Sequence, residues 1–529
     1  MTPSSLKDAL RRPDAFPHQV GRIELAETHA SLVFLAGSRA YKIKKPVDLG
    51  FLDYSTLAKR RHYCREEVRL NRRLAPEIYL DVRPVVGDPP RVAAADEDVD
   101  EEAVREWVVV MKRLDPQDHL RRRLADGRLP EGSIERIAER LKEFYAQADR
   151  GGDIDDYASF DTVSANALDN FEQRRQDALQ ILKPSVLDRI EEATRRRLES
   201  ARPQIEARHR DRRARDTHGD LRLEHIYLDE DGGLHIIDCI EFCDAFRYAD
   251  PLLDVCFLAM DLEIRGYLSA YRALWQTFLG DGAEGLQEEL RDLIDLYCSY
   301  RSSVRAKVHG VKAQDTTVDE DARDRARRLA RAHWYYAWWK ACPPGEGPAL
   351  MLLGGLPASG KSTRARRLRE QGFVDVVIDS DVVRKQLARQ RLDLDDPSSL
   401  DDAPDDWESG IYTPAWTRRT YEAMARQAKQ GLLDGKRVAL AASFRDDQRR
   451  RQFIDVARSL GLPVRFFECT LDDDLARRRL AQRQDDPSDA DWSIYQSIKE
   501  SWDAPSADVA AVHRRLAPSE EPGELWDQP

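Results

Sequence analysis

The stretch that decides the fold of the C-terminal part is Ala349-Leu-Met-Leu-Leu-Gly-Gly-Leu-Pro-Ala-Ser-Gly-Lys-Ser-Thr363. An apolar run typical of a buried strand leads into the pattern G-x-x-x-x-G-K-[ST], and residues 363–370 favour a helix. In such a loop the glycines let backbone N–H groups face a phosphate, and the helix presents its positive end. A chance glycine-rich turn is the alternative, but the flanking strand and helix argue against it. The stretch therefore predicts a site for nucleotide phosphates.

The predicted phosphate loop assigns a role to each of its side chains. Lys361 is expected to reach the β- and γ-phosphates of ATP, and Ser362 is expected to ligate Mg²⁺. ATP and Mg²⁺ are therefore the expected cofactors. The residues expected to contact the nucleotide here are Gly355, Leu356, Pro357, Ala358, Ser359, Gly360, Lys361, Ser362 and Thr363.

Charge and cysteine content limit the class of protein. The 529 residues carry a net charge of −12, which argues against a general binder of nucleic acid or anionic membranes, although local arginine-rich segments leave nucleic acid open. Seven cysteines without a C-x-x-C pair indicate a reducing compartment. Residues 1–17 lack the apolar core of a signal peptide, and no run reaches membrane-spanning length. We expect a cytoplasmic protein without a membrane partner.

The N-terminal part pairs strand lysines with a helical glutamate. Residues 31–46 predict a β-hairpin with Lys42 and Lys44 on one face of its second strand, and residues 55–74 predict a helix that carries Glu67. This arrangement resembles the one that protein-kinase-like folds use to hold the phosphates of ATP. Ordinary lysines and glutamates on an exposed strand and a surface helix are the alternative.

Two later segments carry further acidic residues, Thr217-His-Gly-Asp-Leu-Arg-Leu-Glu-His225 and Leu234-His-Ile-Ile-Asp-Cys-Ile-Glu-Phe242. They resemble the catalytic loop and metal-binding strand of the aminoglycoside phosphotransferase and choline kinase branch. The resemblance implies that Asp220 takes the proton of the acceptor hydroxyl and that Asp238 is the principal Mg²⁺ ligand.

His225 stands where that branch has an asparagine. An imidazole can ligate a metal, but Mg²⁺ prefers oxygen. Two outcomes stay open for this part: an active site with His225 among the metal ligands, or a domain that binds nucleotide without efficient transfer.

Beyond the phosphate loop, residues 373–384 predict a strand that delivers Asp379 and Asp381 at the start of a helix. Asp381 and Arg384 are three residues apart and share a face of that helix. A similar D-x-x-R follows the second strand in the P-loop kinases that include gluconate kinases, polynucleotide 5′-kinases and zeta toxins. The resemblance implies that Asp381 accepts or orients the hydroxyl proton and that Arg384 contacts substrate or phosphate. A helix-capping aspartate with an ion pair is the alternative.

The third strand of this part, residues 437–444, has alanine at 441, where related P-loop proteins often place an aspartate. Asp379 or Asp381 would then have to supply the carboxylate beside Mg²⁺.

A helix over 474–483 places Arg479 and Arg483 on one face, ahead of Asp485-Asp-Pro-Ser-Asp-Ala490. That segment is similar to the lid of these kinases, whose arginines clamp the transferring phosphoryl group. Surface arginines that balance nearby aspartates are the alternative. The acidic stretch 393–409 is expected to form a flap or a solvated loop.

The aromatic cluster 333–340 ends the helical region of the N-terminal part. It suits either stacking on a nucleobase or burial against a neighbouring domain. The proline- and glycine-rich segment that follows predicts a linker. The expected organisation is a domain over 1–341 with a small lobe at about 20–114 and a helical large lobe at about 115–341, a linker at 342–348, a P-loop domain at 349–517 and a tail at 518–529.

Together the two halves resemble a bacterial family of bifunctional proteins with an aminoglycoside-phosphotransferase-like domain before a P-loop kinase-like domain. The resemblance implies a two-lobed α+β kinase-like fold followed by a three-layer α/β/α domain with a parallel sheet. The expected function is ATP-dependent, Mg²⁺-dependent phosphoryl transfer to the hydroxyl of a small molecule. The alternatives are a kinase for nucleic-acid ends or nucleotide sugars, and a regulatory ATPase or ATP sensor. The acceptor and the oligomeric state are not predicted.

Overall fold

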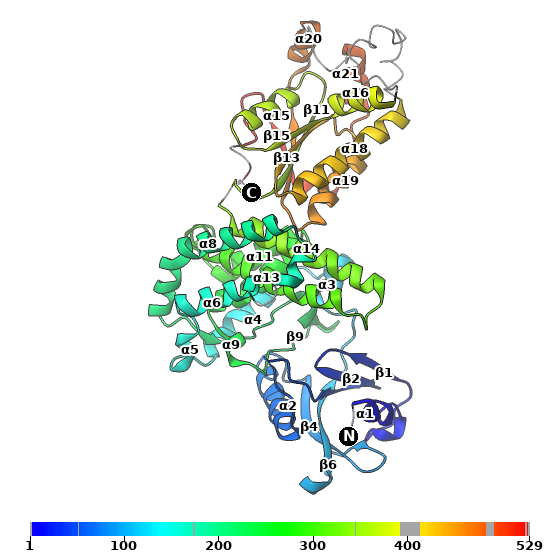
Figure 1. Cartoon of the computed structure of the whole chain (residues 1–529), viewed down its shortest axis with the longest axis vertical. Helices are drawn as coiled ribbons and strands as arrows, with labels where there is room; N and C mark the ends of the chain where they lie inside the picture. The colour runs from blue at the N-terminus through cyan, green and yellow to red at the C-terminus, as the bar shows by residue number, and fades with distance from the viewer. Residues whose placement is uncertain are drawn as a thin grey trace. The chain divides into compact units, whose positions relative to one another are not determined.

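The computed structural model (Figure 1) describes residues 3–50, 52–172, 175–343, 345–391, 413–482, 491–523 and 526. The chain divides into two compact units, each with its own sheet. The first unit comprises Met1–Ser164, Arg202–Glu263 and Ser269–Tyr297, and the second comprises Ala165–Ala201, Ile264–Leu268 and Cys298–Pro529. The domain boundary expected at residues 342–348 stays a prediction. No helix in the described part of the chain is long and apolar enough to cross a membrane.

The first unit is built on an antiparallel sheet of order β1-β2-β3-β6-β4-β5. Its strands are β1 (Ile23–Glu27), β2 (Ser31–Ala36), β3 (Arg39–Lys44), β4 (Tyr79–Val86), β5 (Arg91–Val92) and β6 (Val104–Lys112). The hairpin predicted around Gly37 is confirmed, since β2 and β3 pair directly across that glycine, whose φ is +62°. Alternation along β3 therefore puts Lys42 and Lys44 on the same face.

Helix α2 (Leu57–Asn71) covers that face of the sheet. The Thr56 side chain accepts a hydrogen bond from the Lys59 N–H and caps the helix start. Buried Cys64 and Val68 pack with Tyr79 and Val109 of the sheet. The same buried side of α2 carries Glu67, so a buried carboxylate lies next to the lysines of β3.

The remainder of the first unit is mostly helical, as expected. Two short hairpin strands, β8 and β9, pair antiparallel and follow the loop that contains Asp220. The elements are α1 (Pro3–Ala9), α3 (Leu120–Ala125), α4 (Ser133–Gln147), α5 (Asp153–Asp156), β7 (Arg215–Asp216), β8 (Ile226–Leu228), β9 (Leu234–Ile236), α9 (Asp244–Arg247), β10 (Tyr248–Ala249), α10 (Pro251–Ile264), α11 (Leu268–Leu279) and α12 (Ala283–Glu289), with single 3₁₀ turns at Pro13–Ala15, Glu101–Ala103 and Leu223–His225. Helices α6 (Phe160–Glu172), α8 (Pro184–Arg210) and α13 (Arg291–Gln314) have residues in both units, as do α10 and α11 through their terminal residues Ile264 and Leu268.

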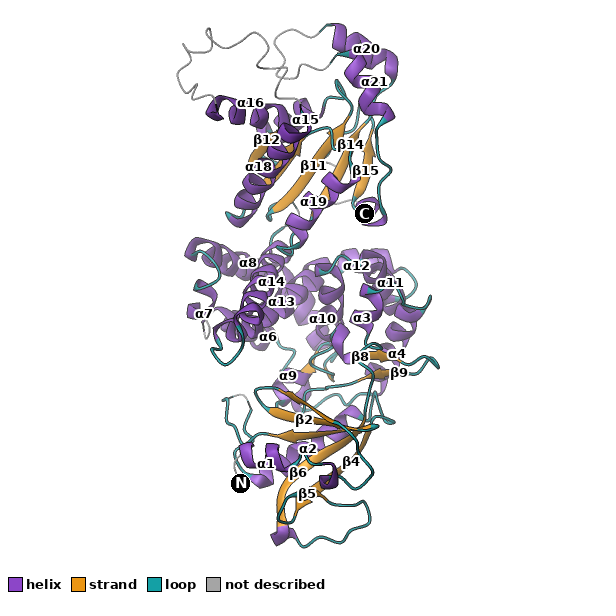
Figure 2. Cartoon of the chain, turned by 90° about the vertical axis from the view of Figure 1, so that its right-hand side faces the viewer, coloured by secondary structure: helices purple, strands orange, loops and turns teal. Residues whose placement is uncertain are grey.

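The second unit contains a parallel sheet of order β12-β13-β11-β14-β15, whose strands run side by side with helices next to them (Figure 2). Every residue of the central strand β11 is buried, as expected for a strand covered on both faces. The strands are β11 (Ala349–Gly355), β12 (Val376–Asp379), β13 (Arg437–Ala441), β14 (Val464–Cys469) and β15 (His513–Leu516). The helices are α7 (Arg175–Leu179), α14 (Glu320–Ala341), α15 (Lys361–Glu370), α16 (Ser380–Arg391), α18 (Pro414–Leu433), α19 (Asp447–Arg458), α20 (Asp473–Ala481), α21 (Trp492–Glu500) and α22 (Ala507–Ala510).

Two apolar clusters make this sheet the middle of three layers. Met351 and Leu353 of β11 point to one face, where they pack with Leu368 of α15. Leu350 and Leu352 point to the other, where they join residues of α18 and α19. The predicted α/β/α domain with a parallel sheet is therefore confirmed.

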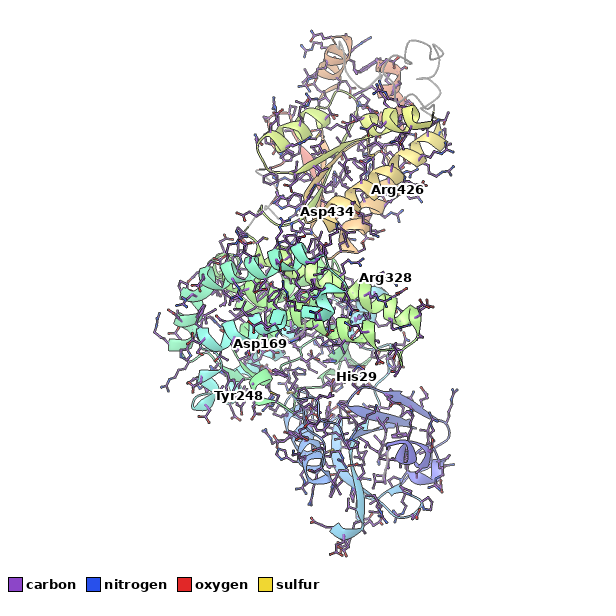
Figure 3. All side chains as sticks on the ribbon, in the orientation of Figure 1. His29, Asp169, Tyr248, Arg328, Arg426 and Asp434 are labelled. Atoms are coloured by element: carbon purple, nitrogen blue, oxygen red, sulfur yellow. The ribbon has the colours of Figure 1, made fainter. Side chains whose placement is uncertain are left out.

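The aromatic cluster at the end of α14 belongs to the core of the second unit. Trp334 and Trp338 are 1% and 2% exposed and lie in the cluster that includes β11 and α18. The Tyr335 hydroxyl donates to the Leu433 carbonyl at 2.6 Å. Asp434, labelled in Figure 3 just after α18, accepts from Lys183 Nζ at 2.6 Å. Both tryptophans therefore serve packing within the second unit.

Candidate functional site

The phosphate loop of the second unit starts from a tightly enclosed glycine. Gly355 ends β11 with φ +143°, and its N–H donates to the Ser443 carbonyl at 3.1 Å. A Cβ on Gly355 would lie 2.6 Å from the Cys469 carbonyl oxygen and 2.7 Å from Ser359 Oγ. Only glycine fits this position without a shift of backbone, so the motif glycine is needed for the turn itself.

Helix α15 begins at Lys361, directly after Gly360 in a left-handed conformation with φ +88°. Ser362 Oγ donates to Asp379 Oδ2 at 2.7 Å. Lys361 makes no hydrogen bond or ion pair with another described residue, and Thr363 is exposed. The lysine charge therefore stands uncompensated at the helix end that is expected to face phosphate.

Strand register explains why Asp379, rather than a residue of β13, lies beside Ser362. Asp379 ends β12 and is paired with Ala441 of β13, which is paired with Leu353 of β11. All three sit at the carboxyl edge of the sheet. Of the two carboxylates considered in place of residue 441, Asp379 contacts Ser362, and its other oxygen accepts the Asp381 N–H at 2.9 Å.

The other predicted residues of this unit lie around the same edge. Asp381 is in the first turn of α16, and Arg384 on the same helix is buried and donates to Thr417 Oγ1 at 3.3 Å. Arg479 of α20 donates to the Ala358 carbonyl within the phosphate loop at 3.1 Å. Arg483, the predicted lid 485–490 and the acidic stretch 393–409 lie outside the described residues.

Arg364 also holds this region together, although the sequence pattern did not single it out. It is buried and donates to the carbonyls of Ser359 at 3.1 Å and of Ala517 and Pro518 at 2.8 and 3.0 Å. Four arginines occur in α15, and only burial separates Arg364 from the other three.

In the first unit, the lysines of β3 meet acidic groups from three other segments. Lys42 Nζ lies 2.8 Å from Glu67 Oε1 and 2.9 Å from Asp238 Oδ1. Lys44 Nζ donates to Glu67 Oε2 at 2.7 Å and also to Glu241, with Tyr54 beside it. The strand lysines and the helical glutamate therefore come together as the sequence suggested.

Burial opposes the charge of both lysines, but the surrounding carboxylates outweigh it. For Lys42 the groups are Asp238, Glu67 and Glu241, and they raise its pKa well above the usual value. The pKa of Lys44 is raised in the same way, chiefly by Glu241 and Glu67. Although burial acts to raise the pKa of Glu67, the two lysines bring it below its usual range. All three groups are therefore charged in the folded protein at neutral pH.

The loop before Asp220 is held by a buried aspartate of α10. The Asp254 carboxylate accepts the backbone N–H groups of His218 and Gly219 at 2.9 and 3.0 Å and the Tyr145 hydroxyl at 2.9 Å. Gly219 has φ +84°, and a Cβ there would lie 2.9 Å from the Phe246 carbonyl oxygen. Burial lowers the pKa of His218 to about 4, so its neutral ring donates to the Ile237 carbonyl.

Asp220, His225 and Asp238 converge and offer ligand atoms within 4.8 Å of one another. Asp238 has φ +66°, and its N–H donates to the Tyr79 hydroxyl at 3.1 Å. Lys42 is the main group that depresses the pKa of Asp238. Burial, followed by nearby Arg222, lowers the pKa of His225 and keeps its ring neutral.

Arg222 occupies the middle of this cluster. Its Nε lies 3.0 and 3.1 Å from the two carboxylate oxygens of Asp220, and one terminal nitrogen lies 2.7 Å from His225 Nε2. The other terminal nitrogen donates to Glu224 at 3.0 Å. Arg222, Glu241, Tyr54 and Asp254 were not assigned a role from the sequence. The one local signal for these contacts is that Arg222 stands two residues from an acidic residue on either side, Asp220 and Glu224.

The two donor sets differ in their fit to Mg²⁺. Ser362 and Asp379 offer oxygen atoms only, which suits this ion. The set in the first unit includes an imidazole nitrogen and faces a guanidinium, so it does not fit Mg²⁺ as it stands.

Residues 350–505 match the family AAA_33, described as an AAA domain. The chain is 32% identical over 489 residues to the uncharacterized protein Rv2004c of Mycobacterium tuberculosis and to Mb2027c of Mycobacterium bovis, with 91% of each chain covered.

Solved structures are also similar to parts of the chain. A choline/ethanolamine kinase family protein from Mesorhizobium loti is 16% identical, with 64% of this chain and 99% of that chain covered and a TM-score of 0.37. A gluconokinase from Sinorhizobium meliloti 1021 is 15% identical, with 34% and 87% covered and a TM-score of 0.24.

Proposed function

We propose that this chain, which belongs to the same family as the mycobacterial protein Rv2004c, is an ATP-dependent phosphotransferase acting on the hydroxyl group of a small molecule. The active site is the phosphate loop of the second unit together with the carboxyl edge of its sheet. The matched AAA domain covers the same residues and supports nucleotide binding there.

The observation that carries this proposal is the hydrogen bond between Ser362 Oγ and Asp379. It brings a hydroxyl and a carboxylate together next to the phosphate loop, and both are the hard oxygen donors that Mg²⁺ prefers. Bound Mg²⁺ would neutralise charge on the nucleotide phosphates at this point.

Residues of the chain would bind the phosphates, accept the proton and orient the acceptor. The N–H groups of the loop and the start of α15 would bind the phosphates, and Lys361 would add a positive charge that no other described side chain pairs with. Asp381, two residues after Asp379, would accept the proton of the acceptor hydroxyl. Arg384 would orient the acceptor or a phosphate, and Arg479 would support the loop through Ala358.

The test is ATP turnover by the purified full chain with and without a small-metabolite extract. Lys361→Ala should abolish any stimulation by the extract, whereas the control Lys436→Ala, which removes an exposed lysine of the same unit, should leave it intact. Stimulation that survives in Lys361→Ala would contradict the assignment of the active site to the second unit.

A second function, nucleotide sensing by the first unit, is favoured by the pairing of Asp220 with Arg222. A base whose carboxylate oxygens both face a guanidinium is poorly placed to take a proton. In that case Asp220→Asn should leave turnover unchanged, while fluorescent-nucleotide titration should still give one bound nucleotide per chain in Lys361→Ala. A large loss of turnover in Asp220→Asn would instead make the first unit a transferase.

A further inference from the structure

A strained turn follows β13 in the second unit. Phe444 in this turn is buried with φ +51°, and its carbonyl accepts a hydrogen bond from Arg450 Nε at 2.6 Å. The carbonyl of Ser443, one residue earlier, accepts the Gly355 N–H of the phosphate loop at 3.1 Å. Bulky residues at positive φ persist only where the surrounding structure holds them, and they cluster at functional sites. The turn is therefore held in place beside the phosphate loop.

Tyr421 of α18 packs on this turn and supports an arginine. The centroid of the buried tyrosine ring lies 5.9 Å from that of the Phe444 ring, and the hydroxyl is hydrogen-bonded with Ser443. The guanidinium carbon of Arg449, in the first turn of α19, lies 5.1 Å from the centroid of the Tyr421 ring. A guanidinium on an aromatic face keeps its N–H donors for a second contact. The tyrosine therefore orients Arg449 without using its N–H groups.

A second arginine reaches the same tyrosine from α16. Arg384 donates to Thr417 Oγ1 at 3.3 Å, one turn before Tyr421 on α18. Burial raises the pKa of Tyr421, and the positive charges of Arg384 and Arg449 act to lower it. Both guanidinium groups therefore lie close to the Tyr421 hydroxyl, although they come from different helices. Two cations close together attract an anion more strongly than either does alone.

Arg449 differs from the arginines next to it in its ion pairs. Arg445 lies 3.9 Å from Asp446, and Arg451 lies 3.1 Å from Asp447. No carboxylate in the described part of the chain pairs with Arg449, which is half-buried. Its charge is therefore available to an anion that comes from outside the chain.

Strand order indicates which substrate would supply that anion. In the order β12-β13-β11-β14-β15, the turn after β13 and the start of α16 lie on one side of the phosphate loop. Arg479 contacts the loop from α20, which follows β14 on the other side. Asp381, the proposed base for the acceptor hydroxyl, shares its side with Arg449 and Arg384. This order therefore puts the two arginines on the side of the acceptor.

We infer that the acceptor carries, besides the hydroxyl that receives the phosphoryl group, a carboxylate or phosphate group bound by Arg449 and Arg384. Both anions match the planar fork of a guanidinium. The anion does not react, and it holds the acceptor so that the hydroxyl faces Asp381. The inference rests on the proposed function and narrows the acceptor from small molecules in general to anionic hydroxy compounds.

The first experiment divides the small-metabolite extract on an anion-exchange resin and adds each fraction to the full chain with ATP. The retained fraction should contain the stimulation of turnover. Stimulation by the unretained fraction alone would overturn the inference and leave the proposed function standing, whereas no stimulation by either fraction would overturn both. Treatment of the retained fraction with a phosphatase, which is removed before the assay, distinguishes the two anions. Lost stimulation would assign a phosphate group, and persisting stimulation would assign a carboxylate.

Substitution of Arg449 tests the named residue. Arg449→Gln should raise the KM for the retained fraction about tenfold to hundredfold, because a charge-assisted contact is lost, with kcat and the KM for ATP unchanged. Arg449→Lys keeps the charge and should restore part of the affinity. Arg426→Gln, at an exposed arginine of α18 labelled in Figure 3, is the control and should change neither KM. An unchanged acceptor KM in Arg449→Gln, or an equal rise in the KM for ATP, would overturn the inference.

Discussion

The two units differ in whether the charged residues of their candidate sites are paired with charges of opposite sign. In the second unit Lys361 has no ion pair with a described residue, and it lies half-buried at the start of α15. In the first unit Lys42 faces Asp238 and Glu67, and Asp220 faces Arg222. The second unit is thus arranged for a charge that comes from outside, whereas the first neutralises its charges internally. A ligand of the first unit must replace these contacts, each worth about 1.5–3 kcal/mol when charged.

The largest expected effect is on stability, and it distinguishes the buried Lys44 of the first unit from Lys361 of the second. Lys44→Met should lower the free energy of opening of the first unit by about 3–5 kcal/mol, because Glu241 stays buried without its lysine and Glu67 keeps only Lys42. Hydrogen exchange of peptides covering β3 and α2 measures this opening. Lys361→Met should leave the exchange of the second unit unchanged.

A matched control is Lys45→Met, which removes a pair with the exposed Glu27 and a hydrogen bond to the Thr28 carbonyl, and should change the opening free energy by less than about 1 kcal/mol. If the β3 and α2 peptides exchanged hydrogen equally fast in Lys44→Met and Lys45→Met, the buried ion pairs of Lys44 would not stabilise the first unit more than the surface pair of Lys45 does.

The next effect concerns chemistry in the second unit. Asp379→Asn removes the charge beside Ser362 and should lower ATP turnover about 100-fold or more. Asp474→Asn, at an exposed aspartate of α20, is the control and should retain full turnover. If Asp379→Asn kept wild-type turnover, the Ser362–Asp379 pair would not be the ion site.

Gly355→Ala tests the enclosure of the phosphate loop. The added Cβ would meet the Cys469 carbonyl at 2.6 Å in a backbone conformation that disfavours side chains, so we expect a loss of about 3 kcal/mol in stability of the second unit. Gly372→Ala has φ +72° but no atom within 4 Å of the new Cβ, and should lose only about 1–2 kcal/mol. Urea unfolding of both variants measures the difference, and similar losses would exclude the close contact as its cause.

The smallest effect comes from a surface pair in the first unit. Lys45 and Lys7 lower the pKa of Glu27 to about 2. Because the folded pKa is below the unfolded one, the carboxylate stabilises above pH 4.5, and this contribution disappears as the pH falls through about 2. The Glu27 side chain is 42% exposed, so Glu27→Gln should change stability by less than about 0.5 kcal/mol at pH 7. A loss above 1 kcal/mol would contradict the distinction between surface and buried pairs.

Sequence reasoning was most informative where function lies in consecutive residues. The strand, loop and helix of residues 349–370 follow from periodicity and from the glycine and lysine positions. The parallel sheet of the second unit was predicted for the same reason. In the first unit, the hairpin and helix that bring Lys42 and Glu67 together also carried local signals.

The sequence by itself therefore determined the phosphate loop, its lysine and serine, and the acidic residues at the ends of strands, because each depends on local backbone geometry. Only the tertiary structure decided which carboxylate meets Ser362, since strand register across β12, β13 and β11 selects Asp379. It likewise decided that Arg222 faces Asp220 and His225, and that Asp254 holds their loop. Such contacts depend on side-chain direction and on burial against distant segments, which no spacing along the chain records.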